Sequence, residues 1–525
     1  MPVQPDVAAL IEALSSGRPG RRKAVAFHLR AYGERPETVA ALVRAALHDP
    51  EPKVRRNAAI SLGKIGAPAA LPAVSGLARA LETEAFPWVR RSVILALGAI
   101  GGAAAQRALQ ALAPQDTAEG EARRAAVARG LPSARVSGWR GCEAGASHLL
   151  RLWLDVPVGL EDVAAAEAAG YGLPGVASGG PGLLRCAPGT APWAVFPTMR
   201  CVYRLLVEAG QGRPLDLASG ASAHLAEQVS RSEALRQLHR WLETAGGVDG
   251  PIPYRLSMER PRVPREVVRT LAAAVREPCR RLGLVENPSR YDLQLVVRSD
   301  GRGCRLFVEP SFVQDDRFAY RRRDVGAALN PVVAAALARL ACGVGAGGGA
   351  VRDGRQITIF DPTCGSGTLL IECARLAPGA RLLGLDISPT AVAAARQNVA
   401  TAGLAERIEV RRGDATDAGA WPACDLVVAN LPFGIRTGQR GADPSRLPRL
   451  YQGVIDNLGR RVRQGGAALL YSTQARRLEA CLNRGGVDRW TIRRRHLEVG
   501  GLRPRTWLLS RPEEEFSTGL TCSCP

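Results

Sequence analysis

The segment VVANLPFGIRTG, residues 427–438, joins an apolar run to a turn that carries an amide and an aromatic ring. The first three residues have the character of a buried parallel strand, and Pro432 keeps the residue before it extended. The side-chain oxygen of Asn430 and the carbonyl of Leu431 could then converge at the edge of a sheet, with Phe433 beside them. Alone, the segment fits an ordinary strand end equally well.

Two acceptors at this point would suit one kind of chemistry. The exocyclic amine of a nucleobase is a poor nucleophile, because its lone pair is delocalised into the ring. Acceptors that hold both N–H groups favour the pyramidal amine, whose lone pair can attack a methyl group in line. Most of the rate would come from positioning, so no strong general base is required. Phe433 could stack on a base taken out of its helix.

A glycine loop precedes this segment in DPTCGSGTLLIE, residues 361–372. Gly365 and Gly367 let the backbone approach a ligand closely. The loop lacks the Gly-Lys-Ser/Thr ending of a phosphate-binding loop and the third glycine of the dinucleotide fingerprint. Asp361 would repel a pyrophosphate but attract an ammonium group. The loop therefore favours S-adenosylmethionine over NAD.

Two further carboxylates follow at the ends of the next two predicted strands. Asp386 could accept hydrogen bonds from ribose hydroxyls, and Asp414 could accept one from an adenine amino group. Each acidic residue alone could be a helix cap or a turn residue. Three of them at successive strand ends, beside a glycine loop, predict a cofactor site.

The motifs DPTCGSGTLLIE, LLGLDIS, GDATD and NLPFGIR occur in this order. Together they resemble the Rossmann-like, class I methyltransferase domain of THUMP-containing RNA guanine-N2 methyltransferases. The resemblance implies S-adenosylmethionine as cofactor and a guanosine of structured RNA, first of all tRNA, as substrate. It implies that the amine is received by Asn430, Leu431, Pro432 and Phe433, and that the cofactor is bound by Asp361, Thr363, Gly365, Gly367, Asp386, Ile387, Asp414, Ala415 and Asn430.

The sequence departs from that family in two ways. Leu431 stands where the family motif usually has a first proline, although its carbonyl remains. A helical repeat region precedes the parts that the family shares. The segment 320–341 resembles the family's lead into the catalytic domain, which would place Asn330 and Pro331 near the cofactor.

The repeats RRKAVAFHLRAYG, VRRNAAISLGKIG and VRRSVILALGAIG end at Gly33, Gly66 and Gly101, with a worn fourth copy ending at Gly130. Their helical periodicity and terminal glycines resemble HEAT-like repeats, which stack as an α-solenoid that could bind protein or RNA. Arg55, Arg56, Arg90 and Arg91 recur at equivalent positions, either as a solvated or internally paired helix face or as RNA contacts.

The middle of the chain has mixed α+β character. GLED (159–162), the VVRSDGRGCRLFVEPS hairpin and FAYRRR (318–323) resemble THUMP modules, which bind RNA; an unrelated α+β insertion is the alternative. Helices are expected near 199–209 and 222–245, a further helix at REVVRTLAAAVREPC, and strands at 291–299 and 304–311.

Strand and helix alternate in the third part, which predicts a parallel sheet closed by an antiparallel pair. The predicted multi-domain organisation is then a HEAT-like α-solenoid (1–134), a THUMP-like α+β region (135–315), a Rossmann-like methyltransferase domain (316–512) and a tail (513–525).

The formal net charge is +21, which favours a polyanionic partner. Only Lys23, Lys53 and Lys64 are lysines, so part of the arginine excess reflects GC-rich codon usage. Arg321–Arg323 and Arg493–Arg495 are candidate phosphate contacts.

The twelve cysteines form no repeated CxxC pairs, which argues against zinc and disulfides and for reduced thiols. Cys364 is expected to pack rather than attack a base, and Cys522 and Cys524 to lie in a frayed tail. Neither a signal peptide nor a long apolar span is recognised, so a soluble cytoplasmic protein is expected.

Other functions stay open at this stage. The motif at Asn430 also suits methylation of guanine-N2 in rRNA, or of adenine-N6 or cytosine-N4 in DNA. A protein of another class, an RNA-binding scaffold with an inactive methyltransferase fold, is a further alternative.

Overall fold

The structure is a computed structural model of the 525-residue chain. It describes residues 7–129, 150–173, 175–187, 192–210, 221–245, 250–260, 263–288, 291–299, 303–311, 315–325, 328–345, 351–352, 355–433, 446–485, 487–488 and 490–512. Contacts divide the chain into two compact units. One comprises Met1–Ser137, Ala209–Arg298 and Gly303–Gln314, and the other comprises Gly138–Glu208, Ser299–Arg302 and Asp315–Pro525.

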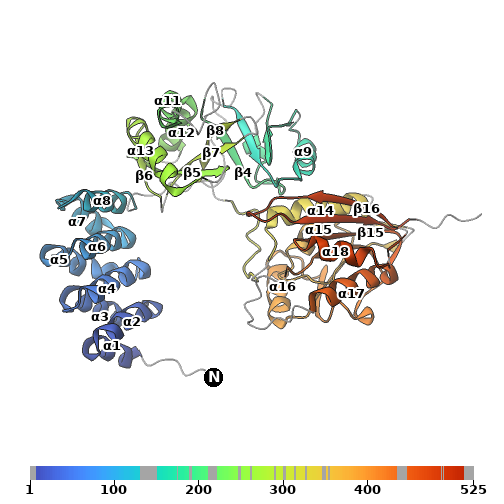
Figure 1. Ribbon diagram of the computed structural model, residues 1–525, viewed down its shortest axis with the longest axis horizontal. Helices are drawn as coiled ribbons and strands as arrows, with labels where there is room; N and C mark the ends of the chain where they lie inside the picture. The colour runs from blue at the N-terminus through green and yellow to red at the C-terminus, as the bar shows by residue number, and fades with distance from the viewer. Residues whose placement is uncertain are drawn as a thin grey trace, which may run out of the picture. The chain divides into compact units, whose positions relative to one another are not determined.

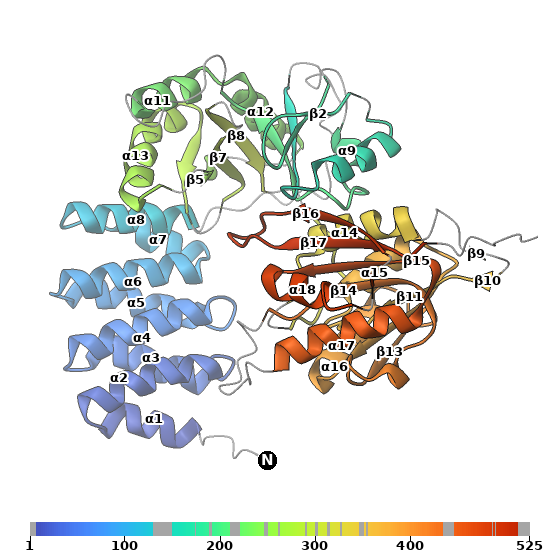
Figure 2. The same ribbon diagram turned by 45° about the vertical axis from the view of Figure 1, so that its right-hand side comes forward.

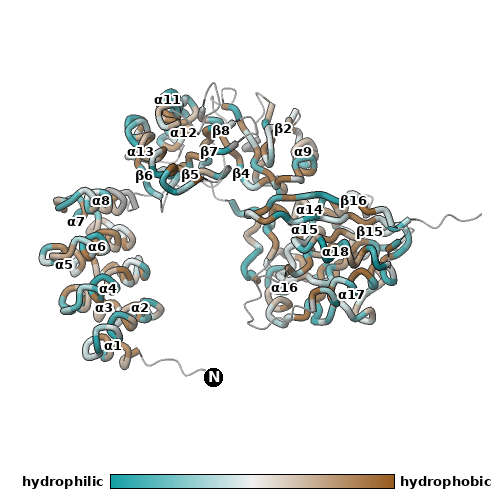
Figure 3. The backbone as a smooth tube through the Cα atoms, in the orientation of Figure 1, coloured by the Kyte–Doolittle hydropathy of each residue, from teal (hydrophilic) through white to brown (hydrophobic). Residues whose placement is uncertain are grey.

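The first part of the chain is a helical solenoid, as predicted. Its helices lie in two layers, with the even-numbered helices stacked on one another and the odd-numbered helices in the second layer (Figure 1). Figure 3 shows brown and teal alternating along each helix, as expected where one face is buried. The elements are α1 (Val7–Ser16), α2 (Pro19–His28), η1 (Leu29–Tyr32), α3 (Pro36–His48), α4 (Pro52–Ile65), η2 (Leu71–Ala73), α5 (Val74–Thr83), α6 (Pro87–Ile100), α7 (Ala103–Ala111) and α8 (Thr117–Arg129).

Proline and glycine mark the ends of these helices. Pro52 and Pro87 occupy the first turns of α4 and α6, where a missing N–H costs nothing. Gly66 and Gly101 follow the same helices at φ of 68° and 70°, a conformation that glycine adopts without steric cost. The predicted glycine terminators are confirmed at these two positions.

The same unit contains an α+β part in the described residues 221–311. Its strands are ordered β8-β7-β5-β6, with β5 parallel to both of its neighbours. The helices predicted at 222–245 and from 265 onward are confirmed, as are the two strands predicted at 291–299 and 304–311. The elements are α11 (Ala221–Arg231), α12 (Glu233–Ala245), β5 (Ile252–Arg260), α13 (Arg265–Arg281), β6 (Leu284–Glu286), β7 (Leu293–Ser299) and β8 (Cys304–Pro310).

The second unit begins with an antiparallel group of strands in the order β2-β3-β1-β4. The helix expected near 199–209 is wrong, because Arg204–Glu208 form strand β4 beside β1. Four of the five residues of β4 are buried, so the run lacks the alternation that identifies a half-buried strand. The other elements are β1 (Leu152–Asp155), α9 (Glu161–Gly170), β2 (Ala177–Ser178), β3 (Leu183–Arg185) and α10 (Pro192–Val195).

A seven-stranded sheet in the order β13-β12-β11-β14-β15-β17-β16 dominates this unit. The first five strands are parallel, and β17 and β16 close the sheet as the predicted antiparallel pair. Helices α17 and α18 cover one face, and α14, α15 and α16 cover the other (Figure 2). The elements are α14 (Pro331–Gly345), β9 (Val351–Arg352), β10 (Arg355–Gln356), β11 (Thr358–Asp361), α15 (Thr368–Leu376), β12 (Arg381–Asp386), α16 (Pro389–Thr401), β13 (Ile408–Arg412), η3 (Ala418–Ala420), β14 (Cys424–Asn430), α17 (Arg446–Arg461), β15 (Val462–Ser472), α18 (Ala475–Leu482), β16 (Thr491–His496) and β17 (Arg505–Ser510).

Candidate active site

The central sheet brings the predicted site residues to one edge. Asp361 ends β11, Asp386 ends β12 and Asn430 ends β14, while Asp414 follows β13 by two residues. These four strands are neighbours and run parallel, so their carboxyl ends lie at the same edge. Ligands of open α/β sheets bind in the crevice at this edge.

The glycine loop between β11 and α15 is fastened to the neighbouring strand. Gly365 and Gly367 have φ of 53° and 78°, which favours glycine at both positions. The N–H of Gly365 donates to Asp386 Oδ2 at 2.9 Å, and the N–H of Cys364 donates to the carbonyl of Leu385 at 2.9 Å. The loop is therefore held in one conformation between two strand ends.

Asp361 is a buried carboxylate at the start of this loop, 1% exposed. One of its oxygens, Oδ1, accepts a hydrogen bond from the N–H of Thr363 at 2.9 Å. Burial and the nearby carboxylate of Asp386 raise the pKa of Asp361 well above its ordinary value. A cationic group at this point would offset the cost of the buried negative charge, so the loop fits a ligand with an ammonium group.

The next carboxylate, Asp386, accepts two hydrogen bonds from backbone N–H groups. Its Oδ1 accepts from the N–H of Ser388 and its Oδ2 from Gly365, both at 2.9 Å. Each carboxylate oxygen can accept a second hydrogen bond, which leaves capacity for ligand hydroxyls. The following residue, Ile387, is 64% exposed, although most large apolar side chains of the described residues are covered. An apolar side chain left open beside an acceptor fits the face of a planar ring.

Asp414 and Ala415 lie at the end of β13. Asp414 is exposed, and its Oδ1 accepts from both the N–H and the hydroxyl of Thr416 at 2.8 Å. Ala415 is buried, and its carbonyl accepts from Trp421 Nε1 at 2.9 Å and from Asn457 Nδ2 at 3.1 Å. The turn after β13 is thus fixed from the core side while the carboxylate faces outward.

Sequence reasoning missed Asn398, a buried amide on α16. Its Oδ1 accepts from the N–H groups of Arg322 and Arg323, both at 2.9 Å. Its Nδ2 donates to the carbonyls of Arg323 and Ser366 at 2.8 and 3.0 Å. The side chain therefore holds the segment before α14 against the glycine loop. Asn398 follows Gln397 in a helix otherwise rich in alanine and valine, and this local pattern does not predict its role.

Asn330 caps α14, because its Oδ1 accepts from the N–H of Val332 at 2.9 Å. The placement of Asn330 and Pro331 near a cofactor stays a prediction.

The segment after β14 is fastened from the core side at each residue. The N–H of Leu431 donates to the carbonyl of Tyr471 at 2.9 Å, and the Leu431 side chain is fully buried in the core that α17 and α18 share with the sheet. Tyr451 Oη donates to the carbonyl of Pro432 at 2.8 Å, and Gln474 Nε2 donates to the carbonyl of Phe433 at 3.0 Å.

The backbone carbonyls of this segment differ in whether they accept a hydrogen bond. Those of Pro432 and Phe433 are occupied, whereas within the described part of the chain the carbonyl of Leu431 accepts no hydrogen bond. Thr363, in the glycine loop, donates from Oγ1 to the carbonyl of Asn430 at 3.3 Å, so the motif and the loop are in direct contact. The part of the motif from Gly434 onward lies outside the described residues.

The residues that hold this segment, Tyr451, Ser472 and Gln474, were also missed. The side chains of Tyr451 and Ser472 are 2.8 Å apart, and Ser472 Oγ accepts from the N–H of Gln474 at 3.0 Å. Burial raises the pKa of Tyr451 to about 12, so its hydroxyl remains a donor at neutral pH. Their roles depend on contacts between distant segments, which no local pattern reveals.

Cys364 packs, as expected. It is buried, and burial together with the carboxylates of Asp361 and Asp386 raises the pKa of its thiol well above the ordinary value. A thiol that stays protonated is a poor nucleophile. The nine cysteines that the structure describes are free, and among the described residues no His, Cys, Asp and Glu side chains cluster as a metal site. Cys522 and Cys524 lie outside the described residues.

Comparison with known families matches two parts of the chain. Residues 319–502 match the family described as RMKL-like, methyltransferase domain, and residues 7–80 match HEAT repeats. In the described residues no helix has the length and apolar character needed to cross a membrane.

Curated relatives match shorter stretches. The U6 snRNA (guanine-N(2))-methyltransferase THUMPD2 of Mus musculus is 30% identical over 113 residues, which are 21% of this chain and 20% of the relative. The tRNA (guanine(6)-N2)-methyltransferase of Archaeoglobus fulgidus is 27% identical over 171 residues, which are 28% of this chain and 41% of the relative. The chain thus spans less than half the length of these relatives.

One solved structure shares the fold over a larger part. The crystal structure of TrmN from Thermus thermophilus has a TM-score of 0.50 at 23% identity, covering 69% of this chain and 99% of that chain. This likeness supports the fold alone. Residues 319–502 are therefore a Rossmann-like methyltransferase domain, in a chain that begins with HEAT repeats and is similar in sequence to enzymes named as RNA guanine-N2 methyltransferases.

Proposed function

We propose that the protein transfers the methyl group of S-adenosylmethionine to the exocyclic N2 of a guanosine in structured RNA, with tRNA as the first substrate to test. One observation carries the proposal. Among the described residues, the carbonyl of Leu431 accepts no hydrogen bond, while the carbonyls on either side of it each accept one. The relatives named as guanine-N2 methyltransferases support the choice of guanine and of RNA.

The cofactor would lie along the edge that carries the acidic residues. Bound S-adenosylmethionine would supply an electrophilic methyl group on a cationic sulfur. Asp361 would attract the ammonium group of its methionine part, with Thr363, Gly365 and Gly367 forming the backbone wall.

The nucleoside end would meet the next two strands. Asp386 would accept hydrogen bonds from ribose hydroxyls and the exposed Ile387 would cover one face of the adenine. Asp414 would accept from the adenine amino group, and Ala415 would hold the turn that carries it.

The substrate amine would be held by the segment after β14. Asn430 Oδ1 and the carbonyl of Leu431 would each accept one N–H of the guanine amine, and Phe433 would stack on the base. The nitrogen lone pair would form the new N–C bond as the S–C bond breaks, and the N–H proton, acidic once the methyl is attached, would pass to water. Positioning supplies most of the rate.

The direct test is transfer of tritium from labelled S-adenosylmethionine to tRNA, rRNA and DNA, followed by identification of the methylated nucleoside. The proposal expects N2-methylguanosine in tRNA. Label in rRNA guanine would redirect it to that substrate, and labelled adenine or cytosine in DNA with unlabelled RNA would refute it. Cofactor binding without transfer to any nucleic acid would support the scaffold alternative.

The proposal extends to the rest of the chain. The region 135–315 would act as a THUMP-like RNA-binding module, and the predicted domain boundaries belong to the same hypothesis. A cytoplasmic location is also proposed, because the nine described cysteines are free thiols. Cell fractionation with recovery of the protein outside the cytosol would contradict it.

A further inference from the structure

The two basic residues that open each solenoid repeat have different environments. The first of each pair lies inward: Arg55 forms an ion pair with Glu84 of the next repeat, and its Nη1 donates to the carbonyl of Asp49 at 2.8 Å. The equivalent arginines repeat this contact, in the pairs Arg22–Asp49 at 2.8 Å, Arg55–Glu84 at 2.7 Å and Arg90–Glu119 at 2.7 Å. These arginines join neighbouring repeats, so the internally paired alternative applies to Arg55 and Arg90.

The second residue of each pair is Lys23, Arg56 or Arg91, one position further along the helix. Within the described residues none of these three forms an ion pair with a carboxylate. Lys23 and Arg56 are exposed and Arg91 is half-buried. In the described part of the chain, these three charges are therefore not paired with a carboxylate.

These cations lie on adjacent helices. Asn57 Nδ2 on α4 donates to the carbonyl of Lys23 on α2 at 3.3 Å, and Arg56 Nε donates to Ser92 Oγ on α6 at 3.4 Å. Gly63 allows close packing, because a Cβ there would lie 3.0 Å from the Cα of Ala96. Helices α2, α4 and α6, which carry these cations, are stacked on one another (Figure 1), and we call the three cations a cationic column.

The distribution of acidic residues differs between the two layers in the first six helices of the solenoid. Helices α2, α4 and α6 contain no Asp or Glu, whereas α1, α3 and α5 each contain a glutamate. All three lysines of the chain, Lys23, Lys53 and Lys64, are exposed on α2 and α4. Codon usage that enriches arginine does not account for lysines confined to two neighbouring helices.

Aromatic rings accompany the column. Phe27, one helical turn after Lys23, is 46% exposed, and the guanidinium of Arg30 lies 3.7 Å from the centre of its ring. Trp88, which is half-buried, lies 6.0 Å from the guanidinium of Arg56. Exposed rings beside cations can stack on unpaired bases while the cations contact phosphates. We name Lys23, Phe27, Arg56, Trp88 and Arg91 the solenoid strip.

We infer that the solenoid strip binds the phosphate backbone of the substrate RNA. This rests on the proposed function in taking RNA as the ligand. Three stacked helices without Asp or Glu, cations without carboxylate partners and the exposed ring of Phe27 fit RNA better than an acidic polypeptide, which has no bases to stack. The paired arginines of the neighbouring positions hold the helices that present the strip.

The test compares two triple variants of the full chain. Lys23→Gln, Arg56→Gln and Arg91→Gln remove the strip's charges. The control, Arg44→Gln, Arg79→Gln and Arg107→Gln, removes the same charge from exposed arginines on the odd-numbered helices α3, α5 and α7. The dissociation constant for unfractionated tRNA is measured from about 0.05 to 0.2 M salt.

The strip variant should bind tRNA about tenfold more weakly or worse at ~0.1 M salt, and the slope of log K against log salt should fall by about 1 for each lost phosphate contact. The control should keep the wild-type slope. Equal affinities and slopes in the two variants would overturn the inference. Poly-glutamate serves as the acidic polypeptide for comparison, and a strip variant that loses poly-glutamate binding but keeps tRNA binding would also overturn it.

Methyl transfer, measured in parallel, separates this inference from the proposed function. If neither the wild type nor any variant methylates RNA, but the strip variant alone loses tRNA affinity, the proposed function is wrong and the inference about the solenoid strip is supported. If the wild type methylates tRNA and the strip variant binds tRNA as tightly as the control does, the inference about the strip is wrong and the proposed function is supported.

Discussion

Arg200 and Glu372 form a two-pronged ion pair in which Nε and Nη2 of the arginine donate to the two carboxylate oxygens at 2.6 and 2.7 Å. Glu372 lies on α15, the helix that begins directly after the glycine loop. Tyr320 Oη donates to the same carboxylate at 2.7 Å. The pair therefore joins the strands of residues 150–208 to the helix behind the candidate cofactor site.

Arg200→Ala should destabilise this unit strongly. Glu372 is 1% exposed, and removing one partner of a buried ion pair costs about 3–5 kcal/mol, because it leaves an uncompensated charge. The Tm should fall by on the order of 10 °C. Thermal unfolding followed by circular dichroism measures the change.

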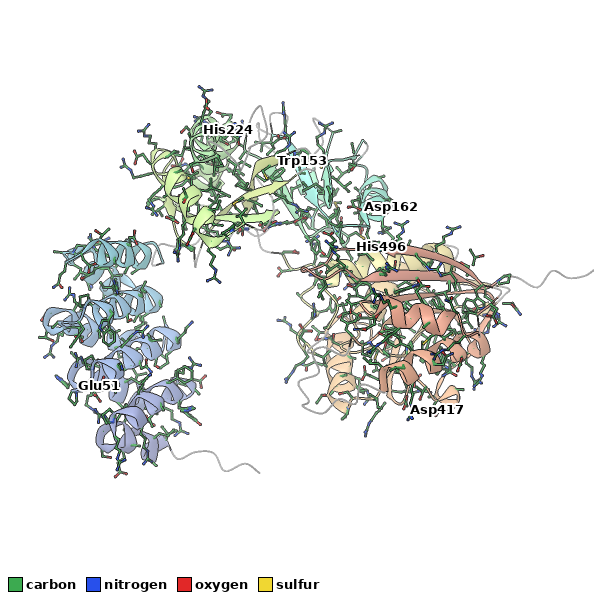
Figure 4. All side chains as sticks on the ribbon, viewed as in Figure 1. Glu51, Trp153, Asp162, His224, Asp417 and His496 are labelled. Atoms are coloured by element: carbon green, nitrogen blue, oxygen red, sulfur yellow. The ribbon has the colours of Figure 1, made fainter. Side chains whose placement is uncertain are left out.

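A second ion pair, which joins α9 to β16 in the same unit, provides the control. Arg495 pairs with Asp162 at 2.6 Å, next to His496 (Figure 4), but both side chains are more than a third exposed. Solvent screening reduces such a pair to about 0–1 kcal/mol. Arg495→Ala should hardly change the Tm, and equal losses in the two variants would contradict the assignment of Arg200.

Tyr451→Phe tests the support of the motif after β14. The variant keeps the ring and removes the hydroxyl that donates to the carbonyl of Pro432 at 2.8 Å. Because small displacements of a positioned group are costly, kcat should fall about tenfold or more with cofactor affinity unchanged. Tyr254→Phe, at a buried tyrosine of the other unit, should leave kcat at the wild-type value. A wild-type kcat in Tyr451→Phe would show that the hydroxyl does not position the motif.

Asn430→Ala and Asp386→Ala should have opposite effects. Asn430 is expected to hold the substrate amine, so its loss should abolish transfer and leave S-adenosylmethionine binding nearly intact. Asp386, whose carboxylate also accepts from Gly365 and Ser388 at 2.9 Å, should chiefly weaken cofactor binding. Calorimetric binding and tritium transfer measure the two effects, and an exchange of the two results would refute both roles.

Leu431→Pro, which restores the residue usual in the resembled family, should destabilise the protein. Proline would remove the N–H that donates to Tyr471 at 2.9 Å and would leave part of a fully buried site unfilled. A loss of about 2–4 kcal/mol is expected. Leu431→Met, which conserves volume and the N–H, should cost less than about 1.5 kcal/mol. Urea denaturation compares them, and a more stable proline variant would be the contrary result.

The raised pKa of Asp361 predicts a pH dependence. Its folded-state pKa lies above its unfolded value, so its contribution to stability is fully present below the unfolded pKa and is lost as pH rises through the folded pKa. Asp361→Asn retains an acceptor for the N–H of Thr363 and removes the charge. Without cofactor, the variant should have a higher Tm than wild type above that window and a smaller dependence on pH.

The affinity for the cofactor should increase with pH, whereas the contribution of Asp361 to stability decreases. An ammonium group prefers the ionised Asp361, so wild-type affinity should rise as pH rises through the raised pKa, and Asp361→Asn should bind weakly at every pH. Titrations of S-adenosylmethionine at several pH values measure this. Wild-type affinity that is independent of pH, with unchanged affinity in the variant, would rule out the ammonium contact.

The sequence by itself determined the elements whose signals are local. Alternating strands and helices, the glycines at 365 and 367 and acidic residues at strand ends predicted the sheet and the edge at which the candidate site lies, because parallel strands place their carboxyl ends together. The repeats predicted the solenoid because their signals are also local: each copy carries its own helical pattern and its own terminating glycine.

The tertiary structure decided what depends on distant partners. Residues 204–208 form a strand because β1 lies beside them, and no local pattern distinguishes such a short apolar run from a helix. Arg200 meets Glu372 across 172 positions, and Tyr451 meets Pro432 across 19. Which arginine of each repeat faces inward was settled by the carboxylate of the next repeat. Long-range pairing follows from packing, and the sequence pattern records only the residues that packing brings together.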